Sequence, residues 1–187
     1  MPVVVTGADQ PLGLAVVGAL LAAGATEVRA TVRDRAAVPG LVGRGVRTAV
    51  SDLVDPLRFG AVLEGAHTVI HLDGGHPGGS HSAGAVAGAT READRDPAGT
   101  GPGGEPTGSW DLLLEAAEDT GVRRLVTVCR PGVDPPPCPY HLIVVRAPSY
   151  RPEPELVAAL VEADRRRYGH GVEVVDLPGR PPGRGAQ

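Results

Sequence analysis

Short apolar runs alternate with longer segments of helical length along most of the chain. The apolar runs are brief and rich in valine, which indicates buried strands rather than helices. We expect strands at 2–6, 27–32, 46–50, 68–72, 124–128, 141–145 and 172–177. Most of the longer segments start near a proline or stop at a glycine, as helices often do. We expect helices at 11–23, 56–64, 109–120 and 154–168.

This alternation of strand and helix predicts an α/β fold. Apolar strands that are joined through helices form a doubly wound, mainly parallel sheet with helices on both faces. We expect the strand order 3-2-1-4-5-6 and right-handed crossovers between the parallel strands. At 187 residues the chain is long enough for one domain but not for two. We place this single domain at 1–178.

Two segments depart from the pattern. Between 73 and 108 the chain holds 11 glycines and 4 prolines, and no sustained period survives there. A long stretch without secondary structure in a compact domain is either functional or disordered, and we expect a flexible surface loop. The tail at 179–187 is rich in proline, glycine and arginine, and we expect it to be disordered.

Composition excludes several classes of function. All 18 basic residues are arginines, so no mechanism that needs a lysine is available. The net charge of −4 argues against nucleic-acid binding, which usually needs a basic surface. No apolar run reaches the ~18 residues of a membrane span, and no basic segment precedes the first apolar run. We therefore expect a cytoplasmic protein that binds neither nucleic acid nor a membrane.

The histidines and cysteines do not predict a metal site. His71, His76 and His81 are spaced five residues apart, which matches no metal motif, and solvated loop histidines are the better interpretation. Cys129 and Cys138 match no metal or redox spacing either. We expect no bound metal.

A turn with the character of a phosphate loop follows the first strand. Residues 6–13 read TGADQPLG and lead directly into the first helix. Backbone N–H groups and the helix dipole at such a helix start favour an anion such as pyrophosphate. Gly7 and Gly13 have the spacing of the outer glycines of such a loop, and Leu12 and Gly13 offer N–H groups. Gln10 stands where a middle glycine would let the backbone approach the phosphates, and Pro11 lacks an N–H.

This loop resembles the TGxxGxxG motif of the short-chain dehydrogenase/reductase superfamily, in particular its extended NAD-dependent epimerase/dehydratase family. Further segments resemble the same family in order and spacing, over roughly two thirds of the chain. They are TVRD (31–34), SDLVDP (51–56), TVIHLDG (68–74) and GSWDLLLEAAEDTGVRRLVTV (108–128). The resemblance implies a Rossmann-type NAD(P)-binding fold.

The resemblance also implies a set of cofactor-binding positions. These positions are Gly7, Gln10, Leu12, Gly13, Arg33, Asp52, Leu53 and Gly74. Arg33 matches the basic residue that holds the 2′-phosphate of NADP in some members, although a solvated loop charge is an equal alternative. Asp34 follows it, and an acidic residue there favours NAD, so the choice between NADP and NAD stays open.

The catalytic residues of the family have no counterpart. Its chemistry uses a Tyr-x-x-x-Lys pair on one helix, and the chain contains no lysine. The helix best matched to that pair is 154–168, and 129–132 (CRPG) supply no serine or threonine after the fifth strand. Because the resemblance implies a longer chain that continues into a substrate lobe, we expect this chain to be truncated relative to the family. We therefore assign no catalytic residue.

Three functions remain open at this point. The first is a degenerate family member, a pseudoenzyme that senses a nucleotide or serves as an accessory subunit. The second is an active NAD(P)-dependent oxidoreductase or epimerase with an unusual acid/base group such as Tyr140 or His141. The third is an interaction scaffold that binds no nucleotide. The helices at 109–120 and 154–168 could contact a second copy or a partner protein, or simply cover the sheet.

Overall fold

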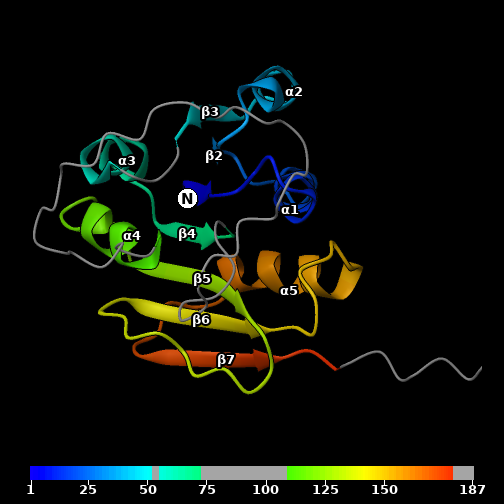
Figure 1. Cartoon of the computed structure of the whole chain (residues 1–187), viewed down its shortest axis with the longest axis vertical. Coiled ribbons are helices and arrows are strands. Elements are labelled where there is room, and N and C mark those ends of the chain that lie inside the picture. Colours follow the sequence, from blue (N-terminus) through cyan, green and yellow to red (C-terminus); the bar gives the residue numbers. More distant parts are fainter. Residues whose placement is uncertain (52–54, 73–108, 179–187) are drawn as a thin grey trace, which may run out of the picture.

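The computed structural model describes residues 1–51, 55–72 and 109–178, which form one sheet covered by helices (Figure 1). All neighbouring strands pair in parallel, in the order β3-β2-β1-β4-β5-β6-β7. The strands are β1 (Val3–Val5), β2 (Val28–Val32), β3 (Arg47–Val50), β4 (Thr68–His71), β5 (Arg124–Cys129), β6 (His141–Arg146) and β7 (Val172–Asp176). The predicted doubly wound α/β fold is confirmed, and β7 extends the expected order by one strand.

The helices match the prediction in most places. They are α1 (Pro11–Ala22), η1 (Arg35–Ala37), α2 (Val38–Val42), α3 (Pro56–Leu63), α4 (Ser109–Ala117) and α5 (Pro154–Arg165). Prolines occupy the first turn of α1, α3 and α5, where their missing N–H costs nothing. The short η1 and α2 were not predicted, and the Pro39–Gly40 pair inside α2 is of a kind that usually marks a turn.

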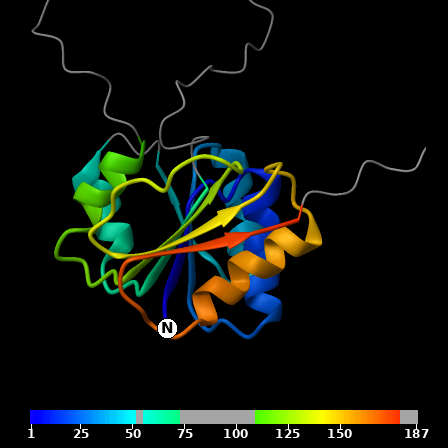
Figure 2. The same ribbon diagram turned by 90° about the horizontal axis from the view of Figure 1, so that it is seen from below.

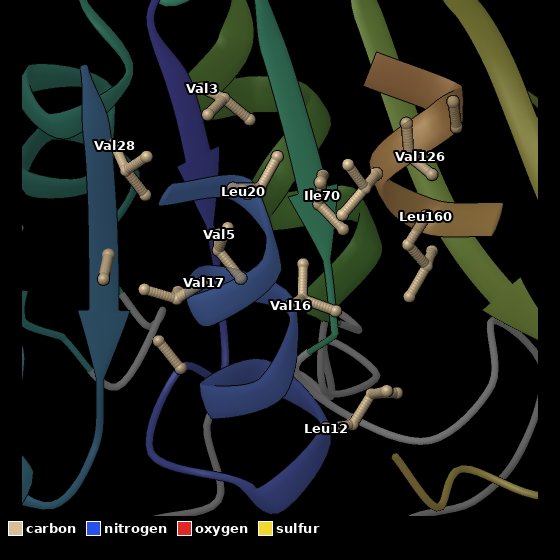
Figure 3. Packing of buried hydrophobic residues seen from close by; sticks show 14 of the residues in the cluster. Val3, Val5, Leu12, Val16, Val17, Leu20, Val28, Ile70, Val126 and Leu160 are labelled. Atoms are coloured by element: carbon tan, nitrogen blue, oxygen red, sulfur yellow. The ribbon is translucent and has the colours of Figure 1, made fainter. Parts of the chain in front are cut away.

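Two apolar layers hold the helices against the sheet. On one face, Val16 and Val17 of α1 and Leu160 of α5 pack over Val5 and Ile70 (Figure 3). On the other face, α3 and α4 form a second cluster with β4, β5 and β6. Figure 2 shows α1 and α5 together on one side of the sheet and α4 on the other. Helices therefore cover both faces, as predicted.

One crossover has the opposite hand to the others. The chain moves from β4 to β5 and from β6 to β7 in the same direction across the sheet. However, α4 and α5 lie on opposite faces, so the two crossovers cannot share one hand. The expectation of right-handed crossovers throughout is therefore wrong for β6–α5–β7. The connection from β5 to β6, residues 130–140, contains no helix.

The positions of α4 and α5 also bear on the predicted partner surface. Because they cover opposite faces of the sheet, the two helices cannot form one continuous surface. Contact with a second copy or a partner through either of them stays a prediction. In the part of the chain that the structure describes, no helix has the length and apolar character needed to cross a membrane.

Candidate functional site

The carboxyl ends of β1 and β4 form the centre of the candidate site. These neighbouring strands mark the place where the strand order changes direction, because the chain builds outward from β1 on one side and from β4 on the other. Ligands of open α/β sheets bind in the crevice at such a switch point. The loop after β1, residues 6–10, and the start of α1 lie at this edge of the sheet, beside the ends of β1 and β4.

Two glycines determine the shape of the loop. Gly7 has a φ of 64°, a left-handed conformation that glycine adopts without strain. A Cβ on Gly13 would lie 2.2 Å from the carbonyl oxygen of Gly7 and 2.7 Å from Cα of Ala8. The first turn of α1 therefore packs directly on the loop backbone. Gly7 and Gly13 are the two positions that the sequence motif singled out.

The start of α1 keeps donors that an anion could use. Gln10, the N-cap residue, has φ −81° and ψ 153° and makes no side-chain cap hydrogen bond. Leu14 N–H donates to Gln10 O at 2.9 Å, whereas the described residues provide no backbone acceptor for the N–H groups of Leu12 and Gly13. Gln10 is exposed and has a negative φ, so the backbone accepts a side chain where the motif has a glycine.

A buried histidine lies beneath the loop. His71, at the end of β4, is only 4% exposed, so its interpretation as a solvated loop residue was wrong. Its Nδ1 lies 3.0 Å from Thr6 Oγ1, which also accepts the Leu72 N–H at 3.1 Å. Burial lowers the pKa of His71 to about 4, and the positive charge of Arg33 acts in the same direction. The imidazole is therefore neutral at pH 7 and links β1 to β4 by hydrogen bonding.

Residues from β5 and α4 complete the floor of the site. The Thr127 hydroxyl donates to the His71 carbonyl oxygen at 3.3 Å, and Ser109 Oγ lies 3.5 Å from His71 Nε2. The rings of His71 and Trp110 meet edge-on, with their centroids 5.9 Å apart. Trp110 in turn donates its Nε1–H to the Pro137 carbonyl oxygen at 3.3 Å. The floor of the site is thus polar and buried.

A carboxylate ties the loop to the end of β2. Asp9 Oδ2 accepts the backbone N–H groups of Arg33 and Asp34 at 3.2 and 3.0 Å. The Ala8 N–H donates to the Thr31 carbonyl oxygen at 3.0 Å, next to this contact. Asp9 lies within the TGADQPLG motif, but the sequence alone indicates no role for it. Its contact spans 24 residues, and no local pattern signals it.

The predicted cofactor positions are partly brought together. Gly7, Gln10, Leu12 and Gly13 form one turn, and the backbone of Arg33 adjoins that turn through Asp9. The predicted positions outside the described residues are Asp52, Leu53 and Gly74. The role of all these positions in cofactor binding stays a prediction.

The unusual acid/base groups suggested by the sequence lie at the wrong edge of the sheet. His141 begins β6 and pairs in register with Arg124 at the start of β5, so both His141 and Tyr140 lie at the amino ends of the strands. The candidate site lies at the carboxyl ends. Tyr150 is better placed, because its hydroxyl donates to the Val128 carbonyl oxygen at 2.9 Å near the end of β5.

Helix α5, which the sequence matched to the catalytic helix of the family, follows β6 and not β5. Within the described ranges, no three histidine, cysteine, aspartate or glutamate side chains gather closely enough to hold a metal ion. His76 and His81 lie outside those ranges.

Solved structures with a similar fold include NAD(P)-dependent proteins. The anaerobilin reductase ChuY from Escherichia coli O157:H7 matches with a TM-score of 0.66 and 14% identity, over 97% of this chain and 100% of that one. MoeE5, solved with UDP-glucuronic acid and NAD, matches with a TM-score of 0.58 and 18% identity, over 94% of this chain and 76% of that one.

Other similar structures are longer proteins. The NADPH-dependent quinone oxidoreductase QOR2 from Escherichia coli matches over 68% of this chain, with 17% identity and a TM-score of 0.45. The present chain spans 34% of its length. No curated protein matches the sequence.

A family model gives the direct assignment. The model described as NAD(P)H-binding matches residues 7–152, which include the loop, the end of β2, and β4 and β5. The matched range covers most of the chain and includes the described residues of the candidate site from Gly7 to Tyr150, but not Thr6. The chain therefore belongs to the NAD(P)H-binding family.

Proposed function

We propose that the chain binds a nicotinamide dinucleotide along the carboxyl edge of the sheet, with its pyrophosphate over the start of α1. The observation that carries this proposal is the uncapped N-terminus of α1 behind the tight Gly7–Gly13 contact. The N–H groups of Leu12 and Gly13 would hold a phosphate oxygen, and the helix dipole would favour its charge. The cofactor supplies hydride transfer when it is bound.

We further propose that the protein works without the Tyr–Lys chemistry of the short-chain dehydrogenases. The chain has no lysine, and the β5–β6 connection at 130–140 has no helix that could carry such a pair. Binding without this chemistry suits a nucleotide sensor or an accessory subunit. In either role, occupancy by the dinucleotide is the signal, and turnover is not required.

A reductase is the second candidate, and Tyr150 is the observation that favours it. Its half-buried hydroxyl lies near the carboxyl end of β5, on the edge where the nicotinamide would bind. There it could donate a proton to a substrate carbonyl oxygen while the carbonyl carbon accepts hydride. In this second reading, Tyr150 replaces Tyr140 and His141 as the candidate acid.

Titration with NADH and with NADPH tests the proposal directly. Trp110 is the one tryptophan of the chain and touches His71 at the base of the site, so its fluorescence should fall on binding through energy transfer to the reduced nicotinamide. Saturation at micromolar concentration supports binding. If neither nucleotide binds at millimolar concentration, the proposal is wrong and the interaction scaffold remains.

Turnover separates the two candidate functions. The loss of absorbance of the reduced cofactor is followed with a panel of carbonyl and quinone acceptors, for the wild type and for Tyr150→Phe. Turnover that falls at least about tenfold in Tyr150→Phe, with cofactor binding unchanged, favours the reductase. Binding without turnover favours the sensor or accessory subunit.

A further inference from the structure

Asp9 places a negative charge beside the end of β2. Its Oδ2 accepts two consecutive backbone N–H groups, those of Arg33 and Asp34, at 3.2 and 3.0 Å. Its other oxygen, Oδ1, is buried and has no hydrogen-bond donor among the described residues. The carboxylate thus occupies a small anion-binding position made by adjacent amides, and it keeps one acceptor unused.

The end of β2 is where doubly wound folds distinguish the two nicotinamide dinucleotides. An acidic side chain there accepts a hydrogen bond from the 2′-hydroxyl of the adenosine ribose, whereas a basic one holds a 2′-phosphate. A phosphate monoester carries about −1.5 to −2 charges at pH 7 and needs donors or cations around it. A neighbouring carboxylate occupies hydrogen-bond donors that a 2′-phosphate would need and repels its negative charge. An uncharged 2′-hydroxyl is not repelled and needs fewer donors.

The sequence suggested Arg33 and Asp34 as the residues that decide between NADP and NAD, but the side chains of both make other interactions. Asp34 turns its Oδ1 to the Ala36 N–H at 2.8 Å and caps η1. The side chain of Arg33 is exposed, and its charge is felt by His71 in β4, two strands away from β2. Neither side chain displaces the Asp9 carboxylate from the backbone N–H groups of Arg33 and Asp34. Asp9 is therefore the acidic group that the end of β2 presents from within the loop.

We propose that Asp9 makes the site selective for NAD(H) over NADP(H). This inference rests on the proposed dinucleotide binding. The carboxylate would repel a 2′-phosphate and deny it the amides of Arg33 and Asp34, whereas an uncharged ribose hydroxyl would not be repelled. The selectivity thus depends on a loop residue that contacts β2 only in the folded chain.

Calorimetric titration of the wild type with NADH and NADPH is the first test. We expect NADH to bind at least about tenfold more tightly. ADP-ribose and its 2′-phosphorylated form should show the same preference, because they contain the adenosine half without the nicotinamide. Equal or tighter binding of NADPH overturns the inference but leaves dinucleotide binding standing. Failure of both nucleotides to bind overturns the proposed function itself.

Two variants then test whether Asp9 causes the preference for NADH over NADPH. Asp9→Asn keeps an oxygen that can accept both amides but removes the charge, so we expect the preference for NADH to fall at least about tenfold. Asp34→Asn removes the same charge one residue beyond Arg33 and should change the preference less than about threefold. An unchanged preference in Asp9→Asn, or an equal loss in Asp34→Asn, overturns the assignment to Asp9. Asp9→Ser is the substitute if the asparagine variant does not fold.

Discussion

Gly13 determines how closely α1 approaches the loop after β1. In Gly13→Ala the new methyl group would meet the Gly7 carbonyl oxygen at 2.2 Å, so the loop and the helix must separate. We expect a loss of about 1–3 kcal/mol in the free energy of unfolding, together with weaker dinucleotide binding. Urea denaturation measures the first effect, and nucleotide titration measures the second.

Gly40→Ala is the matched control for this change. Gly40 lies in α2, and a Cβ there meets nothing within 4 Å. Alanine is the better helix former, so stability should stay equal or rise by up to about 1 kcal/mol. Equal stability losses in the two variants would contradict the tight contact at Gly13.

The burial of His71 gives the protein a pH dependence. Its pKa is about 4 in the folded chain, against an ordinary value of 6.5. Above pH 6.5 the residue is neutral in both states, whereas between pH 6.5 and about 4 only the unfolded chain binds the proton. The free energy of unfolding should therefore fall as the pH drops through this window, by about 3 kcal/mol in total from this residue.

Comparison with His71→Asn isolates this contribution. Burial also lowers the pKa of His67 and of His141, so these residues add losses of the same sign in both proteins. We expect the stability difference between wild type and variant to shrink steadily from pH 7 to pH 4. A constant difference would show that His71 does not titrate in this way. Urea denaturation at a series of pH values makes the measurement.

At the scale of elements, a buried arginine of β5 caps the C-terminal end of α5. Arg124, only 1% exposed, donates to the carbonyl oxygens of Ala163, Asp164 and Arg166 at 3.1, 2.7 and 2.7 Å. The last carbonyls of a helix lack partners within the helix, so this side chain satisfies them. It thereby joins the first residue of β5 to the C-terminal end of α5.

Arg124→Met should show the strength of this link. The substitution keeps most of the side-chain length but leaves the helix carbonyls without their donor, so we expect a loss of about 3 kcal/mol. Arg123→Met is the control, because Arg123 is exposed, and we expect a change within about 0.5 kcal/mol. Thermal and urea unfolding measure both variants. Equal effects would contradict the capping role.

Elements with a strong local pattern were predicted well, and weak ones were not. The apolar strands and the proline-started helices α1, α3 and α5 matched closely, because their signals lie within the segments themselves. Helix α2 was missed, since burial of Leu41 against the core outweighs the turn signal of Pro39 and Gly40. Packing, and not local propensity, makes this short helix.

At the scale of the whole molecule, the proposed ligand joins parts of the chain that are distant in sequence. It would contact the loop after β1 and the end of β2, and it would lie over the ends of β4 and β5. A ligand that binds only the folded protein stabilises it by about 2.7 kcal/mol at a concentration of 100 Kd. For a chain of this size, the melting temperature should rise by about 5–10 °C.

Thermal unfolding with and without NADH measures this shift. ATP at the same concentration is the control, because it carries adenine and phosphates but no nicotinamide ribose. An equal rise with both ligands would indicate a general nucleotide site, and no rise with NADH would contradict dinucleotide binding. Gly13→Ala should reduce the shift at a fixed NADH concentration, because its binding is weaker.

The sequence by itself determined the class of sheet, most of the strand order and the place of the glycine turn between the first strand and the first helix. Valine-rich runs, and prolines and glycines at the helix ends, are local signals whose meaning does not depend on distant residues. The roles of Gly7 and Gly13 were readable for the same reason, because both act within one turn. The absence of lysine likewise excluded the Tyr–Lys pair without any structure.

Only the tertiary structure decided which side chains meet. The contact of Asp9 with the end of β2, the burial of His71 against Thr6, and the edge on which Tyr140 lies all depend on strand pairing. The face that α5 covers depends on the hand of its crossover, which strand and helix patterns do not encode. These features arise between segments far apart in the chain, where the free energy of packing and not local preference selects the arrangement.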